Sequence, residues 1–130
     1  MKRLLDTNAY AALKRDHEGV TRLVRDSTEL AFSVIVIGEL LFGFRNGARF
    51  ERHVLELDEL LSNARVSVLQ VTRTTADRFG RIAAGLRRAG TPIPSNDIWI
   101  AAHAFESGAE LVSFDSHFDA VAGLAWTHVA

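Results

Sequence analysis

Four acidic side chains, each beside an apolar run or within one, are the residues of this chain best suited to chemistry. They are Asp6, Glu39, Asp97 and Asp115. Carboxylates that lie within a few ångströms of one another raise each other's pKa values unless a cation lies between them. Such oxygen ligands suit Mg²⁺ or Mn²⁺, which can acidify a water molecule and neutralise charge on a phosphate.

Three of these acids also have a simpler structural explanation. Asp6 and Asp97 stand where a helix is expected to begin, and backbone N–H groups and the helix dipole favour an acid there. Asp115 precedes a serine, which is equally typical of a turn. The nearby Asp119 could assist or replace it.

Glu39 is the most informative of the four acids. The segment 34–44 around it is apolar on every side of a helix, which predicts a buried helix. A buried carboxylate is unfavourable unless it is protonated, bound to a metal ion or paired with a cation. A metal ligand and a buried ion pair with Arg45 or another arginine are therefore both open.

Short apolar runs alternate with helical patterns along the chain, which predicts an α/β fold with a mainly parallel sheet. We expect strands at 2–6, 30–33, 66–71, 111–113 and 124–127, and helices at 9–15, 18–26, 34–44, 49–63, 75–88 and 96–106. Thr74 or Thr75 is expected to cap the fifth helix and Ser95 the sixth. Because ligands bind at the carboxyl ends of parallel strands, several of the acids are expected at one edge of the sheet.

Length and composition predict a single domain over residues 1–130, since no Pro/Gly/Ser-rich linker divides the chain. The net charge of −1 gives no long-range attraction to a polyanion, although thirteen Arg against two Lys slightly favours phosphate contacts. Cysteine is absent, which excludes disulfides and thiolate metal sites. With no signal peptide or membrane-spanning run, this composition favours a cytoplasmic protein without a membrane partner.

Other residues give weaker signals. The five histidines show no zinc-binding spacing. The arginines of segment 73–88 could contact a nucleic-acid backbone, although a solvated helix face explains most of them better. Trp99 and the eight phenylalanines are better explained as core or dimer contacts than as platforms for base stacking.

Four motifs occur in a specific order along the chain. They are Asp6-Thr7-Asn8 after a short strand, Glu39 in an apolar helix, Asn96-Asp97 before Ile98–Ala102, and Leu111–Asp115 followed by His117-Phe118. Together they resemble a PIN domain, and more narrowly the VapC-type toxins of bacterial toxin–antitoxin pairs. The resemblance covers essentially the whole chain and implies a three-layer α/β/α sandwich with about five strands.

The resemblance also implies a function and its residues. It implies a homodimer that cleaves RNA with Mg²⁺ or Mn²⁺, inhibited by a cognate antitoxin, with a larger toxin–antitoxin assembly left open. It implies that Asp6, Glu39, Asp97 and Asp115 are the catalytic residues and metal ligands. Thr7 and Ser113 match small polar positions that assist them. Phe114 departs from a position that is often polar in the family, which affects substrate contacts more than the metal site.

The residues themselves leave two other functions open. Hydrolysis of phosphomonoesters through an aspartyl-phosphate on Asp6 would want a second acid two residues later, where Asn8 stands instead. A catalytically silent PIN-like module would only bind RNA or a protein. The retained acids argue against such a module, and a metal-binding measurement would separate it from a nuclease.

Overall fold

In the computed structural model, which describes residues 1–130, five strands form one parallel sheet. The strands are β1 (Lys2–Leu5), β2 (Glu29–Ser33), β3 (Val66–Leu69), β4 (Glu110–Ser113) and β5 (Trp126–His128). Their order is β3-β2-β1-β4-β5, and every neighbouring pair is parallel. The chain fills one side of β1 first and then crosses to the other side. β1 and β4 are therefore neighbours at the point where strand order reverses, which is where ligands bind in such sheets.

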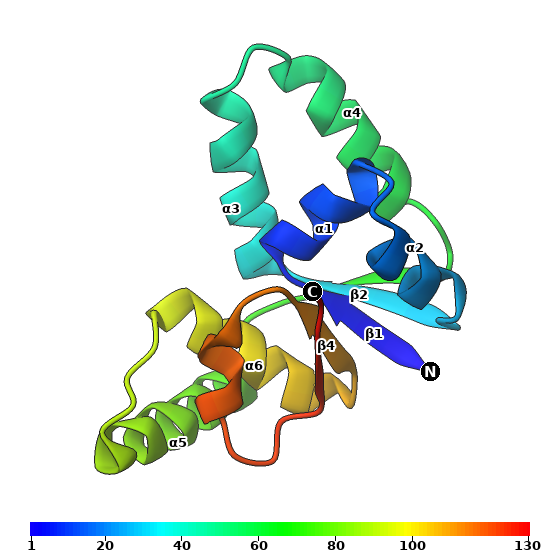
Figure 1. The fold of residues 1–130 in the computed structure, drawn as a ribbon. Coiled ribbons are helices and arrows are strands. Elements are labelled where there is room, and N and C mark those ends of the chain that lie inside the picture. The colour runs from blue at the N-terminus through cyan, green and yellow to red at the C-terminus, as the bar shows by residue number, and fades with distance from the viewer.

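Helices cover both faces of this sheet (Figure 1). One face carries α1 (Thr7–Lys14), α2 (Glu18–Arg25), α3 (Val34–Arg45) and α4 (Phe50–Leu61), and the other carries α5 (Arg73–Ala89) and α6 (Ser95–Ser107). A short 3₁₀ helix, η1 (Ser116–Ala120), follows β4. The expected α/β/α sandwich with a parallel, five-stranded sheet is confirmed. No helix of the chain combines the length and the apolar character that crossing a bilayer requires.

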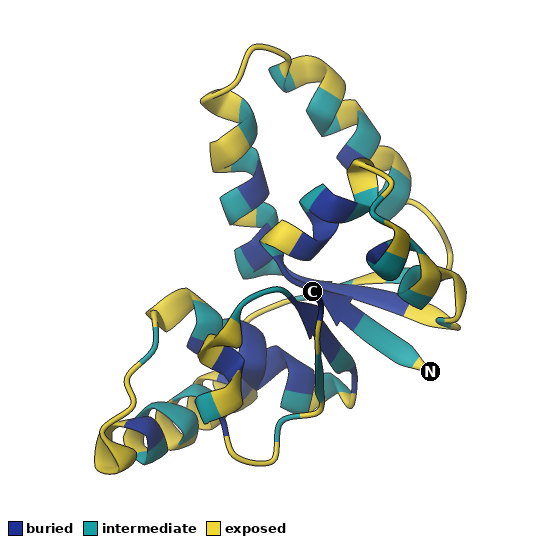
Figure 2. Cartoon of the chain, in the orientation of Figure 1, coloured by how far each residue is buried: buried dark blue, intermediate teal, exposed yellow.

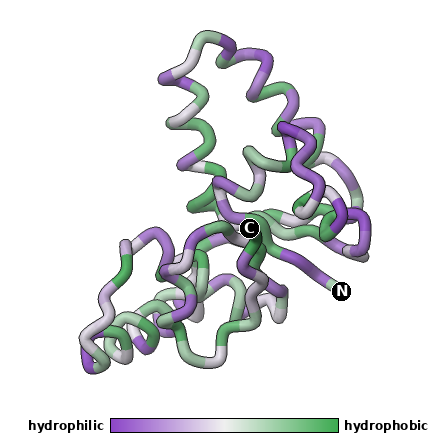
Figure 3. The backbone as a smooth tube through the Cα atoms, viewed as in Figure 1, coloured by the Kyte–Doolittle hydropathy of each residue, from purple (hydrophilic) through white to green (hydrophobic).

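The central strands are buried between the two helical layers (Figure 2). Leu4 and Leu5 of β1 and Phe32 of β2 are fully buried, and Tyr10 of α1 meets the Phe32 ring edge-on at 6.0 Å between centroids. Figure 3, which is coloured by the hydropathy of each residue, shows the same layering. Hydrophobic residues gather at the centre and hydrophilic residues lie along the outer helices. Burial on both faces explains why these strands are apolar runs and do not alternate with polar residues.

The aromatic ring of Trp99 belongs to the helical layer of α5 and α6. It stacks on Phe79 of α5 with 4.1 Å between ring centroids. Trp99 is half-buried. This contact gives the tryptophan a packing role within the chain.

A buried histidine joins α6 to the carboxyl ends of β2 and β3. The Nε2 of His103 lies 3.0 Å from the backbone oxygen of Gln70, and its Nδ1 lies 2.8 Å from Ser33 Oγ. A carbonyl oxygen can only accept, so Nε2 donates to Gln70. The same Ser33 Oγ accepts from the backbone N of Ile35 and caps α3. This network fixes α6 relative to the start of α3.

The expectation that α3 is buried on every side is wrong. Only Val36 and Leu40 of this helix are buried, and the side chain of Phe42 is 70% exposed. The second half of α3 runs with α4 beyond the sheet, where nothing packs on its outer face (Figure 1). An apolar composition predicts burial only as far as the layer beneath a helix extends.

The expected N-caps of the last two helices are also wrong. The cap of α5 is Thr72, whose Oγ1 accepts from the N of Thr75, while the hydroxyl of Thr75 accepts from the N of Thr72. The cap of α6 is Pro94, whose carbonyl accepts from the N of Asp97 at 3.1 Å, and Ser95 is the first helical residue. Thr75 completes a reciprocal capping box here and does not begin the helix itself.

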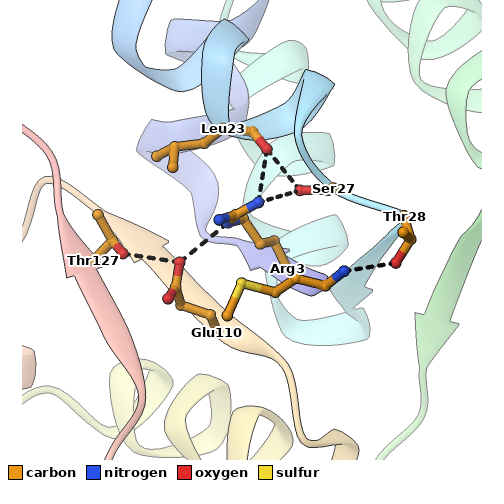
Figure 4. Close-up of polar contacts among 7 residues, drawn as sticks. Arg3, Leu23, Ser27, Thr28, Glu110 and Thr127 are labelled. Carbon is orange, nitrogen blue, oxygen red and sulfur yellow. Dashed lines mark hydrogen bonds and ion pairs between the residues drawn. The ribbon is translucent and has the colours of Figure 1, made fainter.

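At the edge of the sheet opposite to the strands' carboxyl ends, one arginine ties three strands and a helix together (Figure 4). The guanidinium of Arg3 donates to Glu110 Oε1 at 3.1 Å, to Leu23 O at 3.0 Å and to Ser27 Oγ at 3.0 Å. Thr127 Oγ1 donates to the same glutamate oxygen at 2.9 Å. Arg3 therefore joins β1 to β4, β5 and α2.

Removal of this arginine is expected to weaken the fold without touching the other edge of the sheet. The substitution Arg3→Met keeps the apolar stem but leaves the half-buried Glu110 without its cation, which should lower the free energy of unfolding by about 1–2 kcal/mol. Urea unfolding would measure the loss. The exposed pair of Arg22 and Glu18 is the matched control, since Arg22→Met should change stability by less than about 0.5 kcal/mol. Equal losses in both variants would contradict the role given to Arg3.

Candidate active site

Asp6 lies directly after β1 and caps α1. Its Oδ1 accepts from the backbone N of Ala9 at 2.9 Å, and its Oδ2 accepts a hydrogen bond from Ser113 Oγ. The residue is only 7% exposed, and this burial raises the pKa of Asp6 above its ordinary value of 3.8. The bonds from Ser113 and Ala9 lower that pKa in part, and the neighbouring carboxylates of Asp97 and Asp115 raise it further.

Ser113, the last residue of β4, links Asp6 to Asp115. Its Oγ donates to Asp6 and accepts from the backbone N of Asp115 at 2.9 Å. Asp115 in turn caps η1, because its Oδ1 accepts from the backbone N of His117 at 2.8 Å. The register of β1 beside β4 therefore carries both acids to one edge of the sheet.

Asp97 reaches the same edge from the first turn of α6. Its Oδ2 lies 3.1 Å from Nδ1 of His117, and the same ring nitrogen lies 3.0 Å from Asp115 Oδ1. Burial raises the pKa of Asp97 above its ordinary range, and the carboxylates of Asp115 and Glu39 add to that rise. The hydrogen bond and the charge of His117 act in the opposite direction.

Glu39 approaches from α3 and is held by neutral donors. Its Oε1 accepts from Thr7 Oγ1 at 2.5 Å, and its Oε2 accepts from Asn96 Nδ2 at 3.3 Å. It makes no salt bridge, and the guanidinium of Arg45 lies instead over the ring of Phe50 at 4.3 Å. The buried ion pair that the sequence left open is therefore absent. Glu39 is half-buried and faces the other acids.

These acids line one pocket of about 390 Å³ at the carboxyl edge of the sheet, named here the acidic pocket. Its eleven lining residues include the acids Asp6, Glu39, Asp97 and Asp115, and the polar residues Thr7, Asn8, Ser95, Asn96 and His117. No lysine or arginine lines it. Asp119 is exposed and does not line the pocket, so Asp115 is the acid of this segment that joins the others.

The acidic pocket fits a divalent cation. Four carboxylates line the pocket without a lysine or arginine, and burial and the charges of neighbouring carboxylates raise the pKa values of Asp6 and Asp97. A cation bound among them would stabilise their ionised forms. Their oxygen atoms are the ligands that Mg²⁺ and Mn²⁺ prefer.

His117 lines the pocket, although the sequence pattern gives it no role beyond its place in the fourth motif. Zinc-ligand spacing along the chain does not select this histidine, because it meets Asp97 across twenty positions. Its place two residues after Asp115 was the only local signal.

The arginines of α5 do not line the pocket. Of these, Arg81 pairs with Asp77 at 3.0 Å and Arg78 lies over the Phe105 ring.

Comparison with known proteins agrees with this fold and identifies the family of the chain. The PIN domain model matches residues 3–124. Ribonuclease VapC2 of Haemophilus influenzae is 35% identical over 115 residues, which cover 87% of this chain and 86% of that protein. The tRNA(fMet)-specific endonuclease VapC of Salmonella typhimurium is 30% identical over 115 residues, with 87% and 86% covered.

Solved structures of toxin–antitoxin complexes share the architecture. VapBC-1 from nontypeable Haemophilus influenzae aligns with a TM-score of 0.84 and 27% identity over 98% of this chain and 97% of that chain. VapBC2 from Rickettsia felis, solved with a DNA fragment from its promoter, aligns with a TM-score of 0.82 and 26% identity over 98% of both chains. The chain therefore belongs to the PIN-domain family and, within that family, to its VapC branch.

Proposed function

We propose that this protein is an endoribonuclease that hydrolyses RNA phosphodiester bonds with Mg²⁺ or Mn²⁺, and that it is the toxin of a type II toxin–antitoxin pair. The observation that carries the proposal is the convergence of Asp6, Glu39, Asp97 and Asp115 on one pocket that no lysine or arginine lines. The similarity to VapC ribonucleases gives the substrate class. We assign these four acids as the metal ligands and catalytic residues.

The residues of the acidic pocket have distinct tasks in this proposal. Asp6, Glu39, Asp97 and Asp115 would hold the divalent cation, which would supply an acidified water molecule and neutralise charge on the scissile phosphate. Ser113 holds the buried carboxylate of Asp6 in place, and Thr7 and Asn96 hold both oxygens of Glu39. We therefore assign Thr7, Asn96 and Ser113 as positioning residues. Their neutral donors orient the carboxylates without competing for them as a cation would.

The expected partners follow from the same family membership. We propose a cognate antitoxin as the inhibitor, because similar chains were solved as VapBC complexes. We also propose that the chain is one domain over residues 1–130 and forms a homodimer. It would act in the cytoplasm, where RNA substrates occur. A larger toxin–antitoxin assembly is compatible with it.

Cleavage of RNA by the purified chain with and without a divalent ion tests this function. We expect endonucleolytic products with Mn²⁺ or Mg²⁺, none with EDTA, and recovery when the ion is restored. An assay with a phosphomonoester such as p-nitrophenyl phosphate serves as the control for a phosphatase and should show no turnover. A chain that binds the ion and RNA but cuts no RNA would contradict the proposal and favour the silent PIN-like module.

A further inference from the structure

His117 extends the acidic pocket beyond its four carboxylates. Its Nδ1 lies 3.1 Å from Asp97 Oδ2 and 3.0 Å from Asp115 Oδ1. On the basis of the proposed function, we propose that His117 is itself a metal ligand through Nδ1. The site is then a mixed nitrogen–oxygen site that binds Mn²⁺ and later first-row ions in preference to Mg²⁺.

Two of the separations among the three donor atoms match the separation of neighbouring ligands in an octahedral metal site. One donor atom from each of Asp97, Asp115 and His117 lies within 4.8 Å of the other two. Two ligands at right angles around a cation, each about 2.1 Å from it, lie about 3.0 Å apart. This is the separation between the ring nitrogen and each carboxylate oxygen. These distances are compatible with a cation in contact with the ring nitrogen and both carboxylate oxygens.

The local structure presents the ring to the pocket before any ion binds. The backbone N of His117 donates to Asp115 Oδ1 at 2.8 Å, which closes the first turn of η1. The side chain of His117 is 48% exposed, so an ion can reach it from solvent. The backbone hydrogen bond places His117 at the start of η1, and the contacts of Nδ1 with Asp97 and Asp115 turn the ring toward the pocket.

Divalent ions differ in how strongly they bind the nitrogen of an imidazole ring. Mg²⁺ takes oxygen ligands and keeps several waters, so a ring nitrogen adds little to its binding. First-row transition ions bind imidazole well, and their affinity rises from Mn²⁺ to Co²⁺. The contribution of His117 should therefore differ between metals, whereas the carboxylates serve all of them.

A different role for His117 leads to the opposite result. If the ring only supplied positive charge to Asp97 and Asp115 in the metal-free protein, an arriving cation would have to displace it. Removal of the ring would then tighten metal binding. The two roles are therefore separated by the sign of the change in affinity.

Isothermal titration calorimetry of the full chain without RNA tests the proposal with Mn²⁺, Co²⁺ and Mg²⁺. We expect His117→Asn to weaken binding of Mn²⁺ and Co²⁺ by about tenfold or more, with Mg²⁺ affinity changed by less than about twofold. The visible absorption of bound Co²⁺ should also change, because a nitrogen ligand is lost. His53→Asn is the matched control, since His53 lies on α4 and does not line the acidic pocket. His117→Ala should repeat the result.

Three results would overturn this role of His117. They are unchanged Mn²⁺ affinity, tighter Mn²⁺ binding, and an equal loss for Mn²⁺ and Mg²⁺, which would mean that the variant disturbs the carboxylates. Each leaves the proposed ribonuclease standing if the parent chain still binds an ion and cleaves RNA. A parent chain that binds none of the three ions would overturn both proposals.

Discussion

Asp6→Asn should lower the rate of RNA cleavage by about 10²–10³-fold or more, while the metal-free chain stays folded. The variant removes the charge of the most buried acid in the pocket at almost constant shape. An asparagine oxygen can still accept from the N of Ala9, and asparagine caps helices as well as aspartate does. Initial rates of cleavage under saturating Mn²⁺ measure the loss, and circular dichroism checks the fold.

Asp119→Asn is the matched control for this prediction. It makes the same change at an exposed acid of η1 that does not line the acidic pocket. Its cleavage rate should stay within about twofold of the parent, as for surface substitutions that touch no functional group. Parent-like cleavage by Asp6→Asn would remove Asp6 from the metal site. A loss in Asp119→Asn as large as that in Asp6→Asn would give Asp119 the role assigned to Asp115.

Mn²⁺ should stabilise the chain by about 2.7 kcal/mol at a concentration 100 times its dissociation constant. The ion binds the folded pocket and has no comparable site in the unfolded chain. Bound Mn²⁺ should also make stability fall with decreasing pH, which is the opposite of the dependence expected for Asp6 and Asp97 in the metal-free protein. Metal-ligating carboxylates must be ionised, so acidification should release the ion and destabilise the metal-loaded protein.

The metal-free protein should show the opposite dependence on pH at the same groups. Burial raises the pKa values of Asp6 and Asp97 above their ordinary value of 3.8, so the folded state holds these protons more tightly than the unfolded state. Their contribution to stability therefore increases as the pH falls from neutrality through the raised pKa values. This contribution is complete below the pKa that these two aspartates have in the unfolded chain.

Urea unfolding from neutral pH down to the ordinary aspartate pKa of 3.8, with and without Mn²⁺, measures both effects. Histidines and other acids also titrate, so the comparison is between the parent and Asp97→Asn. The variant should lose the part of the pH dependence that belongs to Asp97, and Mn²⁺ should stabilise it less. Parallel pH profiles for parent and variant, or the same sign with and without Mn²⁺, would contradict this account.

The parts of the site predicted from sequence are those set by neighbours along the chain. Asp6 was expected after a strand at a helix start, and it lies there because an apolar run and a capping acid are local signals. Asp97 was expected in the first turn of a helix for the same reason. The five strands and six long helices were predicted from periodicity, and most of their bounds differ by only one to three residues.

The partners of each acid could not be predicted from the same patterns. Glu39 was expected in a buried helix with a cation as one possible partner, whereas its oxygens accept from Thr7 and Asn96. His117 follows Asp115 in the fourth motif, but nothing in that order predicts that its ring meets Asp97. Such contacts depend on how helices pack across a sheet, which local periodicity does not encode.

The amino-acid order by itself determined the elements and the acids at their ends, because hydrophobic periodicity and capping act over a few residues. Tertiary structure decided that β4 lies beside β1, which carries Ser113 and Asp115 to Asp6. It also decided that α3 is exposed along its outer half, because the sheet ends beneath it. The physical reason is that strand order and layer size depend on contacts between distant segments, and these form only when the whole chain packs.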